Sequence, residues 1–110
     1  MKYLAVILGT CCALSLSTTA LAADVDEAML EEGKVLFQSG AAPACAVCHA
    51  LEDAESTGNI GPDLDEVQPS ADAVKQTMID GPGPMPSFSD SLSEDEMDAI
   101  AAYVEHATQD

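Results

Sequence analysis

Residues 45–49 are Cys45-Ala46-Val47-Cys48-His49, and this short stretch decides how the rest of the chain is interpreted. Side chains three residues apart share one face of a helical turn, so the two thiols can point to the same side, and an imidazole follows directly. Each thiol of such a pair can add to a vinyl group of a haem and form a thioether, while the imidazole reaches the iron. The Cys-x-x-Cys-His spacing is typical of c-type haem attachment, and it therefore predicts one covalently bound haem c.

Three other interpretations of the cysteine pair stay open at this point. A thioredoxin-like redox pair needs a βαβ context, but no stretch of the chain shows convincing period-two alternation. A zinc site needs four ligands, and only His106 and the carboxylates would complete it. The third interpretation is an inert pair, and a disulfide between residues so close in sequence would close almost no loop and stabilise the fold little.

Residues 1–22 have the order of a secretory signal peptide. Lys2 precedes a nearly all apolar or small stretch from Leu4 to Leu16, and small residues that include Ala20-Leu21-Ala22 follow it. The apolar stretch is shorter than the roughly 20 residues that span a bilayer, which disfavours an uncleaved anchor. We expect residues 1–22 to be removed on export to the periplasm, leaving residues 23–110 as one domain that is not inserted in the membrane.

The chain is strongly acidic, because 20 Asp and Glu stand against 3 Lys and Arg in 110 residues, a formal net charge of -17. Binding to nucleic acid by phosphate neutralisation and attraction to an anionic membrane both need clustered basic residues, so the composition excludes both functions. Strong negative charge instead favours steering toward a partner protein with a basic docking patch. A saline habitat would give the same composition, and composition does not separate these two origins.

Helical periodicity accounts for most of residues 23–110. The expected helices run from Asp24 to about Gln38, with Asp24 as N-cap and Gly40 as the stop, from Ser70 to Gly81, and from Ser93 onward with Glu96 as its capping-box partner. A short Cys-bearing turn over residues 43–51 is the fourth helical stretch, and a loop through Leu64 follows it. The sequence therefore predicts an all-α fold with long ordered loops.

With these features, residues 23–110 resemble the small bacterial class I cytochrome c family along almost their whole length. Besides the Cys-x-x-Cys-His motif, residues 60–64 match the Gly-Pro-x-Leu loop of that family. The resemblance implies that Cys45 and Cys48 form the thioethers and that His49 is the proximal iron ligand. It also implies that the Pro62 carbonyl accepts a hydrogen bond from Nδ1 of His49, which would fix the tautomer and the ring plane.

The resemblance also implies a fold in which about four short helices wrap around the haem. Gly33 and Phe37 on the first helix match the family positions that cross Ile100 and Tyr103 on the last helix. A glycine at such a crossing allows the two helices to approach closely.

A methionine is the expected second axial ligand, because a thioether raises the haem potential and suits an electron carrier. Met29, Met78 and Met97 lie on apolar faces of expected helices, where methionine is usually core filler. Met85 instead lies in the stretch Gly81-Pro82-Gly83-Pro84-Met85-Pro86, which is hostile to helix, and it resembles the distal Met-Pro loop of the family. We expect Met85 to bind the iron, with Met78 as the alternative.

The chain departs from well-known family members in having no Arg and no Trp, residues that often bind the haem propionates. Lys34, Lys75, Gln or Asn side chains, backbone N–H groups or water would have to take that role here.

The resemblance implies a periplasmic one-electron carrier, not an enzyme, in which His49 and Met85 occupy both axial positions and exclude oxygen chemistry. Its implied partners are a periplasmic dehydrogenase as donor and an oxidase or another cytochrome as acceptor. Two alternatives stay open. One is a cytochrome subunit of a dehydrogenase complex, because residues 61–65 and 85–88 look like those of small cytochromes that serve periplasmic sulfite dehydrogenases. The other is a haem sensor or peroxidase-like enzyme, which would require Met85 to leave the iron.

Overall fold

A computed structural model of the 110-residue chain describes residue 9 and residues 26–109. In chain order the elements are α1 (Glu27–Val35), the π-helix η1 (Leu36–Gly40), α2 (Cys45–Cys48), β1 (Ala50–Leu51), the 3-10 helix η2 (Glu52–Ala54), β2 (Ser56–Thr57), α3 (Leu64–Val67), α4 (Ala71–Asp80) and α5 (Glu94–Thr108). Apart from Gly9, the predicted leader, residues 1–22, lies outside the described residues. No helix in the described part of the chain is long and apolar enough to cross a membrane.

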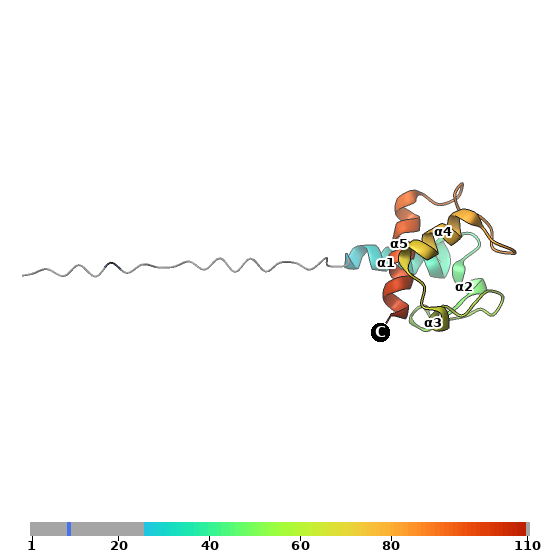
Figure 1. Ribbon diagram of the computed structural model, residues 1–110, viewed down its shortest axis with the longest axis horizontal. Helices are drawn as coiled ribbons and strands as arrows, with labels where there is room; N and C mark the ends of the chain where they lie inside the picture. The colour runs from blue at the N-terminus through green and yellow to red at the C-terminus, as the bar shows by residue number, and fades with distance from the viewer. Residues whose placement is uncertain (1–8, 10–25, 110) are drawn as a thin grey trace, which may run out of the picture.

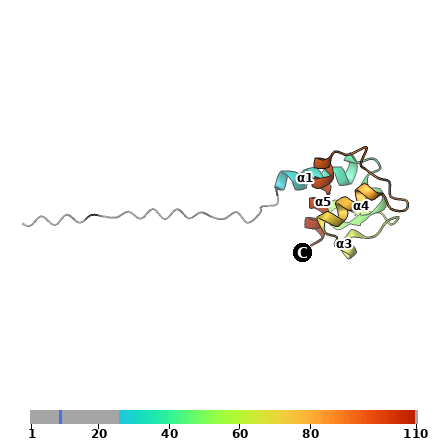
Figure 2. The same ribbon diagram turned by 45° about the horizontal axis from the view of Figure 1, so that its top comes forward.

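The helices α1 and α5 pack against each other and cross at one side of the globule, as both views show (Figures 1 and 2). A Cβ atom at Gly33 would overlap the Ala99 carbonyl oxygen and lie 2.6 Å from Cβ of Tyr103, so only glycine permits this approach. The ring of Phe37 packs edge-on against Tyr103, with centroids 6.0 Å apart and an interplanar angle of 62°. Together with the buried Ile100, these contacts confirm the predicted pairing of the terminal helices.

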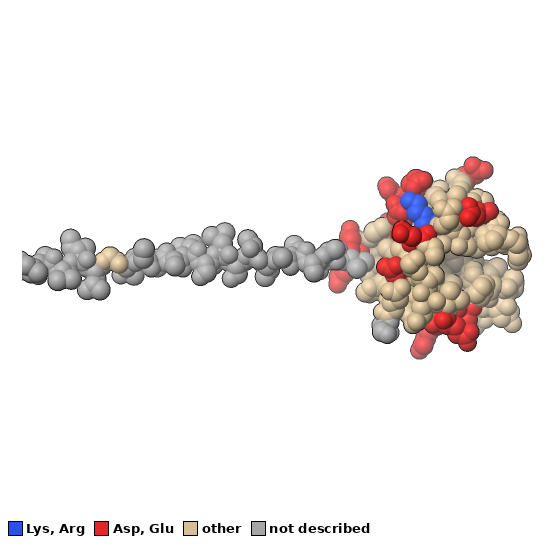
Figure 3. All heavy atoms as spheres, viewed as in Figure 1, with Lys and Arg blue, Asp and Glu red and all other residues tan. Residues whose placement is uncertain are grey.

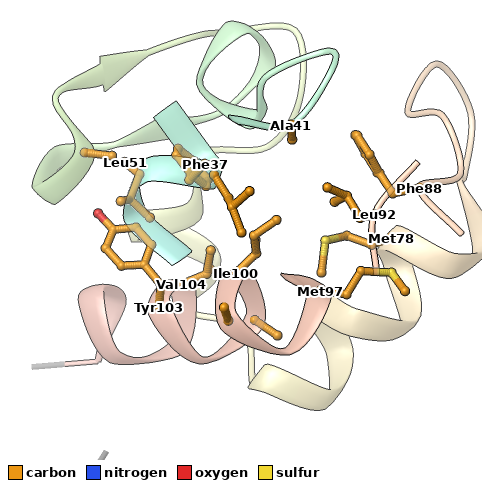
Figure 4. Packing of buried hydrophobic residues seen from close by; sticks show 14 residues of the cluster. Phe37, Ala41, Leu51, Met78, Phe88, Leu92, Met97, Ile100, Tyr103 and Val104 are labelled. Carbon is orange, nitrogen blue, oxygen red and sulfur yellow. The ribbon is translucent and has the colours of Figure 1, made fainter. Parts of the chain in front are cut away.

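The hydrophobic core lies between this crossing and α4 (Figure 4). Its most completely buried large side chains are Phe37, Leu51, Met78, Ile100 and Val104. Burial of a side chain of this size stabilises the fold by about 1.5–3 kcal/mol relative to its exposure. Met78 and Met97 lie together toward α4, and both are almost fully buried, so the prediction that they serve as core filler is confirmed.

The predicted ends of the two long C-terminal helices are also confirmed. Ser70 caps α4 by accepting a hydrogen bond from the Ala73 amide (3.2 Å), and Gly81 ends it with φ at +60°. At the start of α5, the Ser93 hydroxyl accepts from the Glu96 amide (3.1 Å) while the Glu96 carboxylate accepts from the Ser93 amide (2.9 Å). This reciprocal pair is the predicted capping box.

The start of the first helix differs from the prediction. The N-cap is Asp26, whose carboxylate accepts from the Ala28 amide (3.0 Å), so the assignment to Asp24, which lies outside the described residues, was wrong. Several acidic residues near this end are equally good caps, and sequence alone does not choose among them. The helical stretch ends at Gly40 as expected, but its last turn is the π-helix η1, in which the Ala41 amide donates to the Leu36 carbonyl (3.0 Å).

Two small elements within the predicted loop were missed. The strands β1 and β2 pair antiparallel, with Ala50 opposite Thr57, and each is two residues long, too short to show alternation. The single turn α3 is capped by Asp63, whose carboxylate accepts from the Asp65 amide (2.9 Å). The predicted all-α class holds, because β1 and β2 are the only strands among the described elements.

Candidate functional site

The turn α2 carries both cysteines, and the backbone of its neighbours holds it in place. The His49 amide donates to the Cys45 carbonyl (2.9 Å), and the Gly61 amide donates to the Cys48 carbonyl (2.7 Å). A Cβ atom at Gly58 would lie 2.7 Å from the carbonyl carbon of Cys48, so the loop after β2 approaches the turn as closely as glycine allows. Sequence reasoning missed Gly58, because no local pattern shows which distant backbone a glycine contacts.

The burial of the Cys45 thiol disfavours the redox interpretation, and the arrangement of the possible ligands disfavours the zinc interpretation. Burial raises the pKa of the Cys45 thiol to about 11, so this thiol is protonated at neutral pH. A redox-active cysteine acts as a thiolate and needs a lowered pKa, so the raised pKa disfavours the redox interpretation. Among the residues that the structure describes, no three His, Cys, Asp or Glu side chains converge to hold a metal ion. His106, the other histidine of the chain, is exposed on the last turn of α5.

The imidazole of His49 is oriented by a single short contact. Its Nδ1 atom lies 2.7 Å from the carbonyl oxygen of Pro62. A carbonyl oxygen only accepts hydrogen bonds, so Nδ1 carries a proton, and in the neutral imidazole the free lone pair is then on Nε2. A Cβ atom at Gly61 would lie 2.6 Å from Cε1 of the ring, so glycine lets the loop lie against the imidazole. The contact is the one that the family resemblance implies, and it makes Nε2 the atom available to a metal.

A cavity of about 460 Å³ lies beside α2, and its walls are almost entirely apolar. Its volume is within the range of about 300–1,000 Å³ that is usual for cofactor pockets. All of the predicted site residues border this cavity: Cys45, Cys48, His49, Pro62 and Met85. None of the bordering residues is Asp, Glu, Lys or Arg. An apolar cavity bordered by two thiols, an imidazole with a free nitrogen and a thioether fits a covalently bound haem.

The methionines differ in whether they border the cavity. Met78 and Met85 border the cavity, whereas Met29 and Met97 do not. Met78 is 1 % exposed and belongs to the buried core, while Met85 is only partly buried and lies on the loop between α4 and α5. Both candidates for the second axial ligand are therefore retained, and Met85 is the one whose side chain is only partly buried against the core.

Both candidate lysines form ion pairs with carboxylates. The ion pairs join Lys34 to Asp53 (3.4 Å) and Lys75 to Glu94 (2.8 Å) and Asp98 (2.7 Å). Neither lysine borders the cavity. Both ammonium groups therefore already have acidic partners, and a role for either lysine toward a propionate stays a prediction.

Comparisons with known proteins all find similarity to cytochromes. The family model described as "Cytochrome C oxidase, cbb3-type, subunit III" matches residues 28–104. The chain is 30% identical over 74 residues to cytochrome c-551 of Halorhodospira halochloris, which covers 66% of this chain and 94% of the relative. It is also similar to the crystal structure of the c-type cytochrome SorU from Sinorhizobium meliloti, with a TM-score of 0.73, 40% identity, and coverage of 76% of this chain and 94% of that one.

Proposed function

The chain belongs to the cytochrome c family that the model of cbb3-type cytochrome C oxidase subunit III describes, and from this premise we propose that it is a periplasmic one-electron carrier with His49 and Met85 as axial ligands. The family membership, the helical fold and the haem c cofactor predicted from the sequence are thereby confirmed. When bound, haem c supplies the reversible exchange of one electron between ferric and ferrous iron. The observation that carries the proposal is that both thiols, the imidazole and the Met85 thioether border one and the same apolar cavity.

Each residue has a separate role in this proposal. The Cys45 and Cys48 thiols form the covalent tethers. His49 presents Nε2 to the iron, and its Nδ1–H donated to Pro62 fixes the ring and raises the basicity of Nε2. Met85 provides a thioether, which raises the reduction potential. The apolar walls exclude water, and this low-dielectric environment keeps the change in solvation between the two oxidation states small.

Visible spectra of the exported holoprotein, oxidised and reduced, test the ligand set. We expect sharp reduced bands from a covalent haem and a weak far-red band from methionine–iron ligation in the oxidised protein. Covalent haem without the far-red band would remove Met85 from the iron and favour the sensor or peroxidase-like alternative. Absence of haem would contradict the central proposal.

We propose further that electrons pass through an uncharged face, defined as the exposed residues that border the cavity. Its main members are Pro43, Ile60, Pro62, Val67, Pro84 and Pro86. Ile60 is 64% and Val67 55% exposed, so the cavity reaches the surface there. Residues 35–51 and 81–89 contain no Asp, Glu, Lys or Arg, although the whole chain has a net charge of -17.

The charges lie around this face instead of on it. Figure 3 shows acidic side chains above and below an uncharged zone at the end of the globule far from the grey N-terminal trace. Both lysines within residues 26–109 are already paired with carboxylates. We therefore expect the partner to present an uncharged contact patch, with basic residues around it that steer the encounter.

Electron self-exchange between two copies of the holoprotein tests the face without a known partner. We expect Ile60→Asp to slow self-exchange about tenfold, since a buried unpaired charge in the contact costs on the order of 1–2 kcal/mol. Val35→Asp is the matched control, because Val35 is 58% exposed on α1 and does not border the cavity. Equal slowing by the two variants would mean that net charge alone, and not this face, governs the rate.

A second candidate function is that of dedicated acceptor for a periplasmic sulfite dehydrogenase. It is favoured by the likeness of residues 61–65 and 85–88 to the corresponding loops of cytochromes that serve such enzymes. Sulfite plus a purified periplasmic sulfite dehydrogenase would reduce the ferric protein, whereas sulfite alone would not. Co-purification of the dehydrogenase with the cytochrome would favour a permanent subunit over a free carrier.

A further inference from the structure

The loop that carries Met85 leaves α4 and returns to it. Gly81 turns the chain out of the helix with φ at +60°, and the Phe88 amide donates back to the Met78 carbonyl in the last turns of α4 (2.8 Å). The Ser87 hydroxyl donates to a second carbonyl of the same helix, that of Ile79 (2.7 Å). Residues 81–88, called here the methionine loop, are therefore fastened at both ends to one helix terminus.

Between these fastenings the methionine loop has little to hold it. Pro82, Pro84 and Pro86 have no N–H group to donate. The Met85 amide donates within the loop, to the Pro82 carbonyl (3.1 Å). Gly83 has φ at +58°, and a Cβ atom there would meet nothing within 4 Å. The Met85 side chain packs partly against the core, and the position of its backbone depends mainly on how firmly the two ends of the loop are held.

Ser87 holds the returning end at the point of closest approach. A Cβ atom at Gly81 would overlap the amide nitrogen of Ser87, so the two ends of the methionine loop are in contact there. The Ser87 hydroxyl oxygen also accepts from the Ser89 amide (3.3 Å), so this one group joins the loop both to α4 and to the segment that follows. Each of these bonds would be lost on truncation of the side chain.

We propose that Ser87 is a positioning residue for Met85: its hydroxyl, bonded to the Ile79 carbonyl, closes the methionine loop and keeps the thioether at the cavity. This inference rests on the proposed ligation of the iron by Met85. An external ligand binds only when the thioether has moved away, so its apparent affinity is proportional to the fraction of molecules with an open loop. Loss of a hydrogen bond of ordinary strength raises that fraction about fivefold.

Cyanide titration of the ferric holoprotein, followed by loss of the far-red methionine–iron band, tests the proposal. We expect Ser87→Ala to bind cyanide about fivefold more tightly than the wild type. Ser87→Thr retains the hydroxyl and should restore the wild-type affinity. The matched control is Ser70→Ala, which removes the N-cap of the same helix and destabilises the fold without touching the methionine loop.

The outcomes separate the two proposals. Tighter cyanide binding by Ser87→Ala alone supports the positioning role. Unchanged affinity in Ser87→Ala, or an equal rise in Ser87→Ala and Ser70→Ala, overturns that role while the wild-type far-red band leaves Met85 ligation standing. A wild-type spectrum without the band overturns Met85 ligation, and the role of Ser87 with it.

Discussion

The two sides of the cavity are built in opposite ways. One side, called here the cysteine wall, is formed by α2 and residues 58–62. Short hydrogen bonds hold it, such as those from the Gly61 amide to the Cys48 carbonyl and from His49 Nδ1 to the Pro62 carbonyl, both 2.7 Å. At Gly58 the backbone lies so close to α2 that a larger side chain would not fit there. The methionine loop is held at its two ends and has open space at Gly83. The first wall suits a permanent attachment, whereas the second suits a ligand whose hold on the iron is adjustable.

This difference has a functional consequence. Covalent attachment demands that both thiols and the imidazole stay in one fixed arrangement, which a close-packed turn provides. If Met85 is the axial ligand, as we propose, its thioether carries no covalent tether, so small changes in the loop would alter its bond to the iron without loss of the haem. Each of the following predictions tests one side of the cavity against the other.

The largest effect is expected on the cysteine wall. The double variant Cys45→Ala/Cys48→Ala should lose all covalently bound haem, because no other thiol of residues 23–110 is available to form a thioether. Met85→Ala should retain covalent haem in full, since its position contributes no tether. Intact mass of the two purified proteins distinguishes them, and haem that stays on the double variant after denaturation would contradict the assignment.

Substitutions in the methionine loop should instead change the visible spectrum and the reduction potential of the haem. Met85→Ala should lose the far-red band and lower the reduction potential, because the thioether favours the ferrous state. Met78→Ala should keep the band but lower the free energy of unfolding by about 2–5 kcal/mol, the usual cost of a cavity at a fully buried site. Potentiometry and denaturant unfolding measure the two quantities. Loss of the band in Met78→Ala alone would make Met78 the ligand.

Alanine at two glycines compares the packing of the two sides directly. Gly58→Ala forces a Cβ atom against the backbone of α2, so we expect a loss of about 3 kcal/mol, at the upper end of overpacking costs. Gly83→Ala meets open space and should cost only the roughly 1 kcal/mol of a left-handed backbone conformation. Denaturant midpoints of the two holoproteins give the comparison, and equal losses would show that the two sides are equally constrained.

The parts of this molecule that could be predicted from sequence are those set by local chemistry. The Cys-x-x-Cys-His spacing, the serine caps of α4 and α5 and the proline-rich setting of Met85 each depend on residues a few positions apart. The resemblance to a known family added Pro62 and the pairing of Gly33 with the last helix. All five predicted site residues border one cavity as a result.

The parts that could not be predicted depend on contacts between distant segments. The tight approach of Gly58 to α2 and the bond from Ser87 to Ile79 exist only in the folded chain. The strands β1 and β2 and the turn α3 are too short to show a period. The ion pairs of Lys34 and Lys75 were unforeseen because a sequence does not show which carboxylates lie beside each ammonium group.

The smallest effect concerns the support of the cysteine wall by α5. After α2 the chain continues through β1 into η2, where the Asp53 carboxylate accepts from the Tyr103 hydroxyl (2.6 Å) and lies 3.4 Å from Nζ of Lys34. The methionine loop has no such side-chain bond to α5 among the described residues. The hydrogen bond from Tyr103, helped by Lys34, lowers the pKa of Asp53 below its ordinary value of 3.8.

The sign of the resulting pH dependence follows from this lowered pKa. A carboxyl whose pKa is lower in the folded state stabilises the fold above its unfolded pKa and loses that contribution as pH falls through the folded value. Tyr103→Phe should therefore cost about 0.5–1 kcal/mol at neutral pH, a small value because the Asp53 side chain is half exposed. The gap between wild type and variant should close as pH falls below 3.8. Asp53→Asn, which cannot ionise, is the control, and a gap that stays constant with pH in thermal unfolding would show that Tyr103 stabilises the wall by packing alone.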